Sequence, residues 1–128
     1  MRNPCDDVQL PRVHLDEMRF IGPAEIRLLA GTIDTRYHAF VLLGAYSGLR
    51  LGEMAGLRWR RIDLERGRVE VAEISVEING TILFGPPKTK AGRRTVPIPD
   101  VVVKALHTAR CEQAHDDDLV FRAPVVAP

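Results

Sequence analysis

An apolar run at residues 39–46 constrains the fold of this chain more than any other stretch of the sequence. Wound as a helix, it is apolar on nearly every side, which is typical of a helix buried at the centre of a domain. Gly48 is suited to ending such a helix, so the pattern predicts a helix over about residues 37–47. Because a helix of this kind needs cover on all its faces, the rest of the chain is expected to pack around it.

Three further helices are predicted around the central one. The first begins at Pro23, since proline suits the first helical position and Glu25 lies near the positive end of the helix dipole, and it ends before Asp34. A short helix over about residues 50–57 follows the central helix. The last predicted helix begins after a proline and covers about residues 100–113.

A strand pattern occupies the middle of the chain. Residues 68–78 alternate apolar and polar side chains, which predicts a half-buried strand, and a shift of the apolar phase predicts a bulge near Ala72-Glu73. Asn79-Gly80 predicts a two-residue hairpin turn, because both positions tolerate positive φ. Return strands are expected at residues 81–84 and 95–98. The expected class is α+β, with helices packed around a buried central helix and a three-stranded antiparallel sheet.

Composition sets limits on domain number and on partners. The 128 residues, 45% hydrophobic and 27% charged, suit one soluble domain with a modest core. We expect an extended, linker-like leader at residues 1–15, the domain at 16–121 and an irregular tail at 122–128. The net charge is only +1, so the chain lacks the basic excess of many DNA-binding proteins, and any contact with DNA has to be local.

Cysteine use and hydropathy indicate the compartment. Cys5 and Cys111 lie far apart and form no Cys-x-x-Cys motif, which is compatible with a reducing cytosol. The first residues lack the apolar core of a secretory signal, and the longest apolar run is too short to cross a bilayer. The sequence therefore predicts a cytoplasmic protein with no membrane partner.

Arg50 and a basic turn at residues 88–94 are candidate anion-binding groups. A guanidinium fixed behind a rigid helix can hold a phosphate with two parallel hydrogen bonds, although such a residue can equally be a surface cation or a helix cap. A basic turn is more often a solvated hairpin tip than a site. Residues 50–94, however, hold ten basic and six acidic side chains in a nearly neutral chain. This local excess favours a polyanion such as DNA.

Metal-dependent chemistry and other enzyme classes have weaker support. His107, Cys111 and His115 are spaced to share one helical face, as metal ligands do, but a helix end with two exposed histidines and a half-buried thiol explains them as well. No Gly-rich phosphate loop or His-Glu-x-x-His motif is present in the sequence. Nothing fixes the separation of Glu53 and Asp63, as a glycosidase pair would need. No metal, nucleotide or other cofactor is expected.

Two sequence blocks carry the candidate chemistry. The first reads Ser-Gly-Leu-Arg-Leu-Gly-Glu at residues 47–53 and is followed by a Leu-Arg-Trp step at 57–59. The second reads Pro-Lys-Thr-Lys-Ala-Gly-Arg-Arg-Thr-Val-Pro at residues 87–97, after the Asn-Gly hairpin. In this order the two blocks resemble the amino-terminal part of the catalytic domain of tyrosine recombinases, the phage integrase family. The resemblance implies a role by descent in DNA integration and recombination, with double-stranded DNA as the partner.

The resemblance also implies roles for single residues. In this family a tyrosine attacks a DNA phosphate without a metal and forms a phosphotyrosyl link. Arg50 matches the arginine that holds the non-bridging phosphate oxygens, and Lys88 matches the lysine that acts as general acid, with Lys90 as the alternative. Glu53 matches an acidic residue expected to orient its neighbours rather than to carry a proton. Expected DNA contacts are Arg58, Arg60, Arg61, Lys90, Arg93 and Arg94.

The sequence also departs from the family. No His-x-x-Arg block follows the predicted last helix, where the family has one, and the two tyrosines, Tyr37 and Tyr46, precede Arg50 and match no nucleophile. We therefore expect a truncated domain that is catalytically incomplete alone. The alternatives are a non-catalytic DNA-binding or regulatory module that pairs with an intact recombinase, and a prophage remnant that only self-associates. Self-association is expected because a central helix without its full cover leaves an apolar patch exposed.

Overall fold

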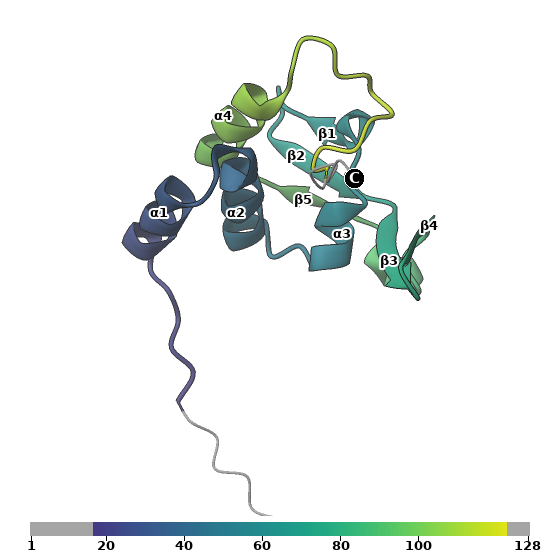
Figure 1. Cartoon of the computed structure of the whole chain (residues 1–128), viewed down its shortest axis with the longest axis horizontal. Coiled ribbons are helices and arrows are strands. Elements are labelled where there is room, and N and C mark those ends of the chain that lie inside the picture. The colour runs from purple at the N-terminus through teal and green to yellow at the C-terminus, as the bar shows by residue number, and fades with distance from the viewer. Residues whose placement is uncertain (1–16, 123–128) are drawn as a thin grey trace, which may run out of the picture.

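The computed structural model describes residues 17–122, and its helices gather around α2 (Thr35–Ser47). Helix α1 (Pro23–Thr32) packs on one side of α2, and α4 (Asp100–Ala109) packs on another (Figure 1). The predicted leader at residues 1–15 and nearly all of the predicted tail lie outside the described residues. Within the described part, no helix is long and apolar enough to cross a membrane.

The ends of α2 are set by the residues that the sequence indicates. Asp34 precedes the helix, and its Oδ1 accepts the backbone N–H of Arg36 at 3.1 Å. Gly48 ends the helix with φ at 66°, a left-handed conformation that glycine adopts without strain. Leu42 and Leu43 are buried in the core. The α+β class and the central position of this helix are confirmed.

Burial of α2 is graded rather than complete. Leu42 and Leu43 are buried, Phe40 is half-buried, and Ala45 is exposed. The ring of Phe121 packs edge-on against Phe40, with centroids 5.0 Å apart, so a segment distant in sequence covers part of the helix. No large apolar side chain of residues 39–46 is exposed in the described structure. The expectation of an exposed apolar patch on this helix is therefore wrong.

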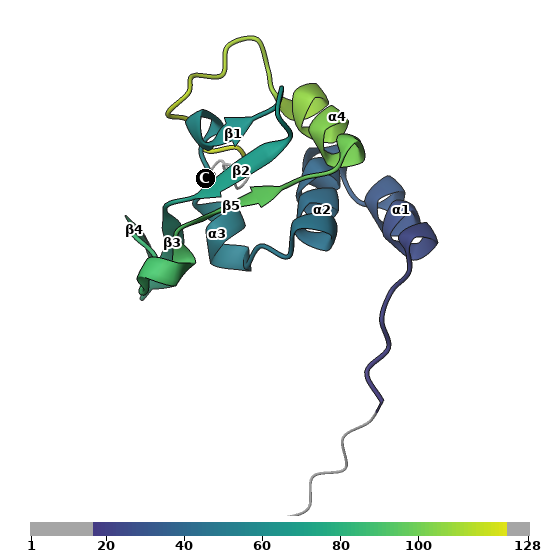
Figure 2. The ribbon, with the colours of Figure 1, turned by 180° about the vertical axis from the view of Figure 1, so that it is seen from behind.

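A three-stranded antiparallel sheet lies against α2 and α3 (Leu51–Ala55), and Figure 2 shows it from the side opposite these helices. Its order is β1 (Ile62–Asp63), β2 (Arg68–Val71) and β5 (Arg94–Pro97). Val69 and Val71 of β2 are buried, whereas the residues that alternate with them are not. This pattern is the alternation expected of a sheet with one covered face.

The sheet differs from the prediction in its strands. The predicted strand at residues 68–78 is two strands, because the chain leaves the sheet at Ala72-Glu73, where a bulge was expected. The second half, β3 (Ile74–Ile78), pairs only with β4 (Thr81–Gly85) and forms a separate two-stranded hairpin. The predicted turn is confirmed, with φ of 51° at Asn79 and 78° at Gly80. The third member of the main sheet is β1, which the sequence pattern did not indicate.

The last helix is shorter than predicted. It ends at Ala109, and residues 116–120 return along residues 57–60. The Trp59 N–H donates to the Asp118 carbonyl at 3.1 Å, and the Val120 N–H donates to the Leu57 carbonyl at 2.9 Å. The backbone of residues 116–120 thus forms its hydrogen bonds with a distant part of the chain, and not within a continued helix.

Helix α3 and strand β3 approach each other very closely. An added Cβ at Gly52 would lie 2.8 Å from the Ser75 carbonyl oxygen, and one at Gly56 would lie 2.9 Å from the Ser75 nitrogen. Gly52 lies in α3 and Gly56 directly follows the helix, and their spacing of four positions puts both on the side that faces β3. Their missing side chains allow the hairpin to sit directly on the helix that follows Arg50.

Candidate functional site

Arg50 lies at the junction of α2 and α3 and is held there by its backbone. Leu49 before it is buried, and the Arg50 N–H donates to Oε2 of Glu53 at 2.8 Å as α3 begins. The residue itself is exposed, and its guanidinium makes no ion pair with any residue in the range 17–122. A fixed backbone therefore presents to solvent a planar cation that has no ion-pair partner in the described part of the chain, which suits binding of an anion.

Glu53 is the one buried charged residue of the described chain, with 4% of its surface exposed. Arg94 binds both carboxylate oxygens, with Nη1 2.8 Å from Oε1 and Nη2 3.1 Å from Oε2. These hydrogen bonds, helped by the N–H and charge of Arg50, outweigh burial and hold the pKa of Glu53 below its ordinary value. The same contact raises the pKa of Arg94. Both groups are therefore charged at neutral pH.

This ion pair joins the two sequence blocks. Glu53 lies in α3, the helix that begins directly after Arg50. Arg94 is the first residue of β5 and follows the turn that carries Lys88. One carboxylate thus contacts the backbone of Arg50 and the side chain of Arg94. The sequence prediction placed Arg94 on DNA and did not foresee this contact. The available signal was a glutamate beside apolar residues of a short helix, since buried carboxylates need a cationic partner.

Lys88 and Lys90 lie between β4 and β5, around the short helical turn η2 (Lys90–Gly92). Both are exposed, and neither forms an ion pair within the described part of the chain. The turn is fixed by Thr89, whose side chain accepts the N–H of Gly92 at 3.2 Å. Two ammonium groups on one turn are therefore without an ion pair among residues 17–122, and both remain candidates for the role of the family lysine.

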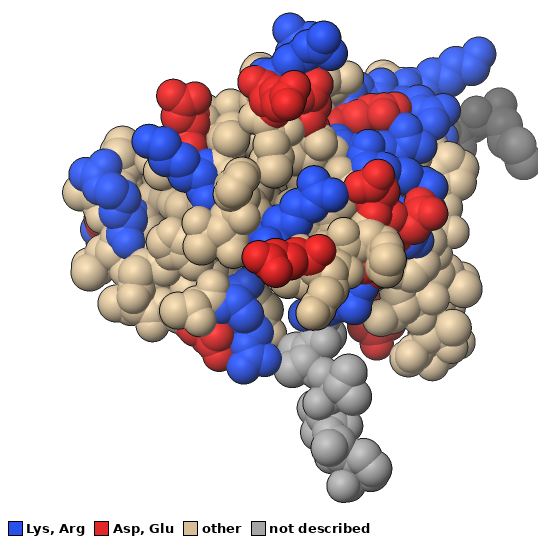
Figure 3. All heavy atoms as spheres, turned by 90° about the horizontal axis from the view of Figure 1, so that it is seen from above, with Lys and Arg blue, Asp and Glu red and all other residues tan. Residues whose placement is uncertain are grey.

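The other basic residues expected on DNA meet carboxylates. Arg58 pairs with Glu73 at 2.8 Å, and Arg61 pairs with Glu70 at 2.7 Å. Arg60 pairs with Asp117, and Arg93 lies near Glu70. Figure 3 shows acidic side chains among the basic ones on one face of the molecule. Pairing weakens the positive potential of these arginines, whereas Arg50, Lys88 and Lys90 keep their charge without an ion pair inside the range 17–122.

Arg58 has a further structural contact. Its Nη1 donates to the Asp117 carbonyl at 2.6 Å, and its guanidinium lies over the ring of Phe84, 5.3 Å from the centroid. With its bond to Glu73, this side chain joins the hairpin, the chain before it and the returning segment. Arg58 therefore has the contacts of a residue that holds elements together.

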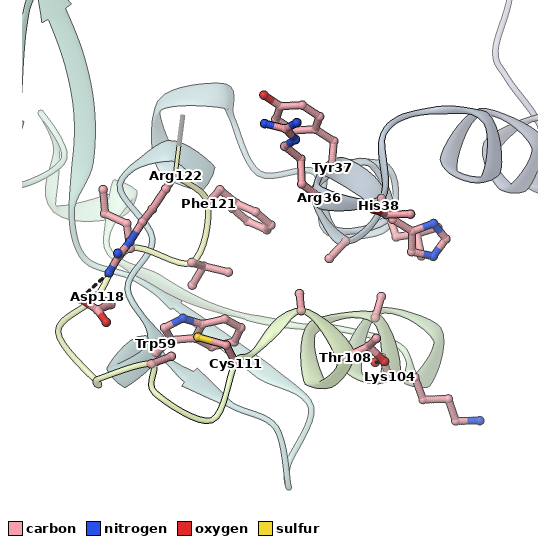
Figure 4. Close-up of a pocket in the computed structure, with 18 of the residues that line it drawn as sticks. Arg36, Tyr37, His38, Trp59, Lys104, Thr108, Cys111, Asp118, Phe121 and Arg122 are labelled. Atoms are coloured by element: carbon pink, nitrogen blue, oxygen red, sulfur yellow. Dashed lines mark hydrogen bonds and ion pairs between the residues drawn. The ribbon is translucent and has the colours of Figure 1, made fainter. Parts of the chain in front are cut away.

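A large groove lies away from Arg50 and the Lys88 turn. A groove of about 1060 Å³ runs between α2, α4 and residues 118–122, with Trp59 and Cys111 among its lining residues (Figure 4). Arg50, Glu53 and Lys88 do not line it. Because α4 ends at Ala109, the candidate metal ligands His107, Cys111 and His115 do not share a helical face. The described residues contain no group of three side chains placed to hold a metal.

Comparison with known proteins identifies the family. Residues 19–123 match the sequence profile described as "Phage integrase family". The chain belongs to the phage integrase family. Among curated relatives, prophage integrase IntR of Escherichia coli (strain K12) is 52% identical over 63 residues, 48% of this chain and 14% of the relative. The ICEBs1 integrase of Bacillus subtilis (strain 168) is 29% identical over 119 residues, covering 91% of this chain and 32% of the relative.

Solved structures show the same fold in tyrosine recombinases. The crystal structure of XerA recombinase has a TM-score of 0.62 at 24% identity and covers 90% of this chain and 38% of the matched chain. The Tn1549 transposon integrase in complex with transposon right end DNA has a TM-score of 0.60 at 23% identity. The match covers 81% of this chain and 33% of the matched chain. This chain thus spans about a third or less of the length of the two integrases named above.

Proposed function

We propose that this chain binds double-stranded DNA and supplies the first half of a tyrosine recombinase phosphate site. Arg50 would hold the non-bridging oxygens of the scissile phosphate. The observation that carries the proposal is the exposed guanidinium of Arg50, unpaired within residues 17–122, on a backbone fixed by the bond from the Arg50 N–H to Glu53. The structure of the Tn1549 integrase with transposon DNA supports DNA as the partner.

The remaining roles follow from charge and contact. Lys88 is proposed as the general acid for the leaving 5′-oxygen, with Lys90 as the alternative, because both ammonium groups are exposed and unpaired within the described residues. Glu53 is proposed to position Arg50, since its oxygens are already bound by Arg94 and by the Arg50 N–H. We assign the ion-paired arginines, Arg94 first among them, mainly to the support of this arrangement.

Duplex-DNA binding in a salt series tests the proposal. The double variant Arg50→Ala, Lys88→Ala is expected to bind at least tenfold more weakly, since each charge-assisted hydrogen bond to a phosphate is worth about 1.5 kcal/mol or more. The slope of log affinity against log salt should fall by about two, because two phosphates would no longer be neutralised by the protein.

A matched control distinguishes DNA binding at a local site from a general effect of positive charge on affinity. Arg27→Ala with Lys104→Ala removes the same charge from exposed positions on α1 and α4. This control should keep nearly all the affinity of the unaltered chain. An equal decrease of affinity in the two double variants, or no decrease in the first, would show that Arg50 and Lys88 do not bind the DNA.

Covalent chemistry is not expected of these 128 residues alone. Tyr46 is half-buried against the core, and Tyr37 lines the groove beside α2 with Arg36 5.7 Å from its ring centroid. Neither is proposed as a nucleophile, because Tyr46 packs against the core and Arg50 does not line the groove of Tyr37. A DNA substrate with a phosphorothiolate at the cleavage site should yield no protein–DNA adduct. An adduct that survives denaturing electrophoresis and maps to either tyrosine would contradict the assignment.

A further inference from the structure

The hairpin of β3 and β4 has one covered edge and one open edge. The backbone of β3 at Ser75 faces Gly52 of α3 and Gly56 just after it, so this edge is covered by the helix and its end. On the other side, β4 has no neighbouring strand within the described residues. All of residues 81–84 are exposed. An open strand edge of this kind is a template for pairing with another strand.

The register shows which backbone groups of β4 are free. The nitrogen and oxygen of Ser75 point to α3 and hence away from β4. In an antiparallel pair, a residue whose backbone groups point away from the partner strand lies opposite a residue that does the same. Phe84, which pairs with Ser75, therefore also points its N–H and C=O outward. The same alternation holds for Ile82 opposite Glu77. Ile82 and Phe84 therefore present four backbone groups on the open edge.

The side chains of the hairpin are apolar on both faces. Val76 and Leu83 lie opposite each other on one face and are 42% and 50% exposed. Ile82, 57% exposed, and Phe84, 40% exposed, lie on the other face. Glu77 is the only charged residue in 74–85. The edge thus lacks the lysines that bind DNA phosphates and the charges that commonly protect strand edges.

We propose that β4 pairs with β4 of a second copy of this chain, antiparallel and centred on Leu83. A two-fold axis through Leu83 sets Ile82 opposite Phe84 of the second copy, and each such pair exchanges two backbone hydrogen bonds. The result is a continuous four-stranded sheet. Both faces then gain apolar cross-strand pairs, because Ile82 meets an aromatic ring and the two Leu83 side chains meet each other. This association is separate from the proposed DNA contact and goes beyond it.

The strength of the pairing follows from its size. One short strand per copy buries less than the roughly 1,200 Å² total of a standard interface, so the dimer is weak and depends on concentration. A second copy is favoured over an unrelated peptide because it supplies an exposed Phe84 opposite each Ile82 and a Leu83 opposite Leu83, in register with the four backbone groups.

Proline substitution tests the edge directly. Because the Ile82 N–H points outward, Ile82→Pro blocks the open edge without removing a bond inside the hairpin. Glu77→Pro is the matched control, since it removes an outward N–H from the opposite edge. In sedimentation velocity over a concentration series, the unaltered chain and Glu77→Pro should dimerise, while Ile82→Pro stays monomeric with unchanged circular dichroism. A monomeric unaltered chain, or equal behaviour of the two variants, would overturn the proposal.

Cysteine cross-linking tests the register. In the proposed pairing the two Leu83 residues form a non-hydrogen-bonded pair, with Cα atoms about 4.5 Å apart, a distance that a disulfide can bridge. In a background of Cys5→Ser and Cys111→Ser, Leu83→Cys should form an interchain disulfide on mild oxidation. Val76→Cys, on the same face but one strand away from the axis, should not. Cross-linking that is equal in both, or absent from Leu83→Cys, would show that β4 does not pair in this way.

Discussion

The variant Arg94→Ala is expected to lower the free energy of unfolding by about 3 kcal/mol, a large share of the stability of a small domain. Glu53 would stay buried while losing both hydrogen bonds from its cationic partner. Only the N–H of Arg50 would remain bound to its carboxylate. We place the cost at the low end for a buried pair because the Arg94 side chain is itself 35% exposed. Denaturant unfolding, followed by the fluorescence of the single tryptophan, measures the change.

The pH dependence distinguishes this mechanism from general loss of packing. The pKa of Glu53 is lowered in the folded chain, so its contribution to stability is present above the unfolded pKa and is lost as pH falls through the folded pKa. In Arg94→Ala, Glu53 is buried without its cationic partner, which raises the pKa of Glu53. Protonation at low pH then removes the buried unpaired charge and its cost to the folded state. The stability difference between the two proteins should therefore shrink as the pH is lowered.

Arg93→Ala serves as the control. Its side chain is 63% exposed and lies 4.0 Å from Glu70, so its removal should change stability by no more than about 0.5 kcal/mol. If Arg93→Ala and Arg94→Ala destabilise equally, or if their difference does not vary with pH, then the Glu53 contact is not the cause.

The variant Gly52→Ala is expected to destabilise the chain by about 1–3 kcal/mol, even though alanine favours helix formation. Its Cβ would lie 2.8 Å from the Ser75 carbonyl oxygen, a backbone atom that cannot move aside without moving the hairpin. Helix α3 and β3 must therefore separate. Unfolding experiments measure the cost, and the amide chemical shifts of Ile74 and Ser75 should report the displacement.

Gly31→Ala provides the comparison within a helix. Gly31 lies in α1, and a Cβ at this position would meet nothing within 4 Å. Substitution there should stabilise the chain by up to about 1 kcal/mol. A gain at Gly52 similar to the gain at Gly31 would mean that α3 and β3 have room between them.

Local signals account for what the sequence could predict. Asp34 and Gly48 set the ends of α2 by their own caps and backbone angles, and Asn79-Gly80 closes its hairpin with neighbouring residues. The break in alternation at Ala72-Glu73 was also visible, although it marks the passage between two sheets and not a bulge. In each case the interaction spans only a few residues, so a short pattern contains enough information.

Long-range contacts account for what it could not predict. Val69 pairs with Val96 across the main sheet, and no pattern near either residue selects this partner over β4. The bond between Glu53 and Arg94 joins residues on separate elements. The end of α4 at Ala109 depends on the return of residues 116–120 to a distant segment. For the candidate site, the sequence indicated Arg50 and Lys88, but the support around them required the structure.

The return of residues 116–120 along residues 57–60 also bears on the order of folding during synthesis. The ribosome delivers Trp59 long before Asp118 and Val120, so the Trp59 N–H and the Leu57 carbonyl have no chain partner until the later segment emerges. Trp59 is buried in the finished structure and is the only indole in the chain. Its emission in a nascent chain would therefore report the arrival of residues 116–120 at the backbone of residues 57–60.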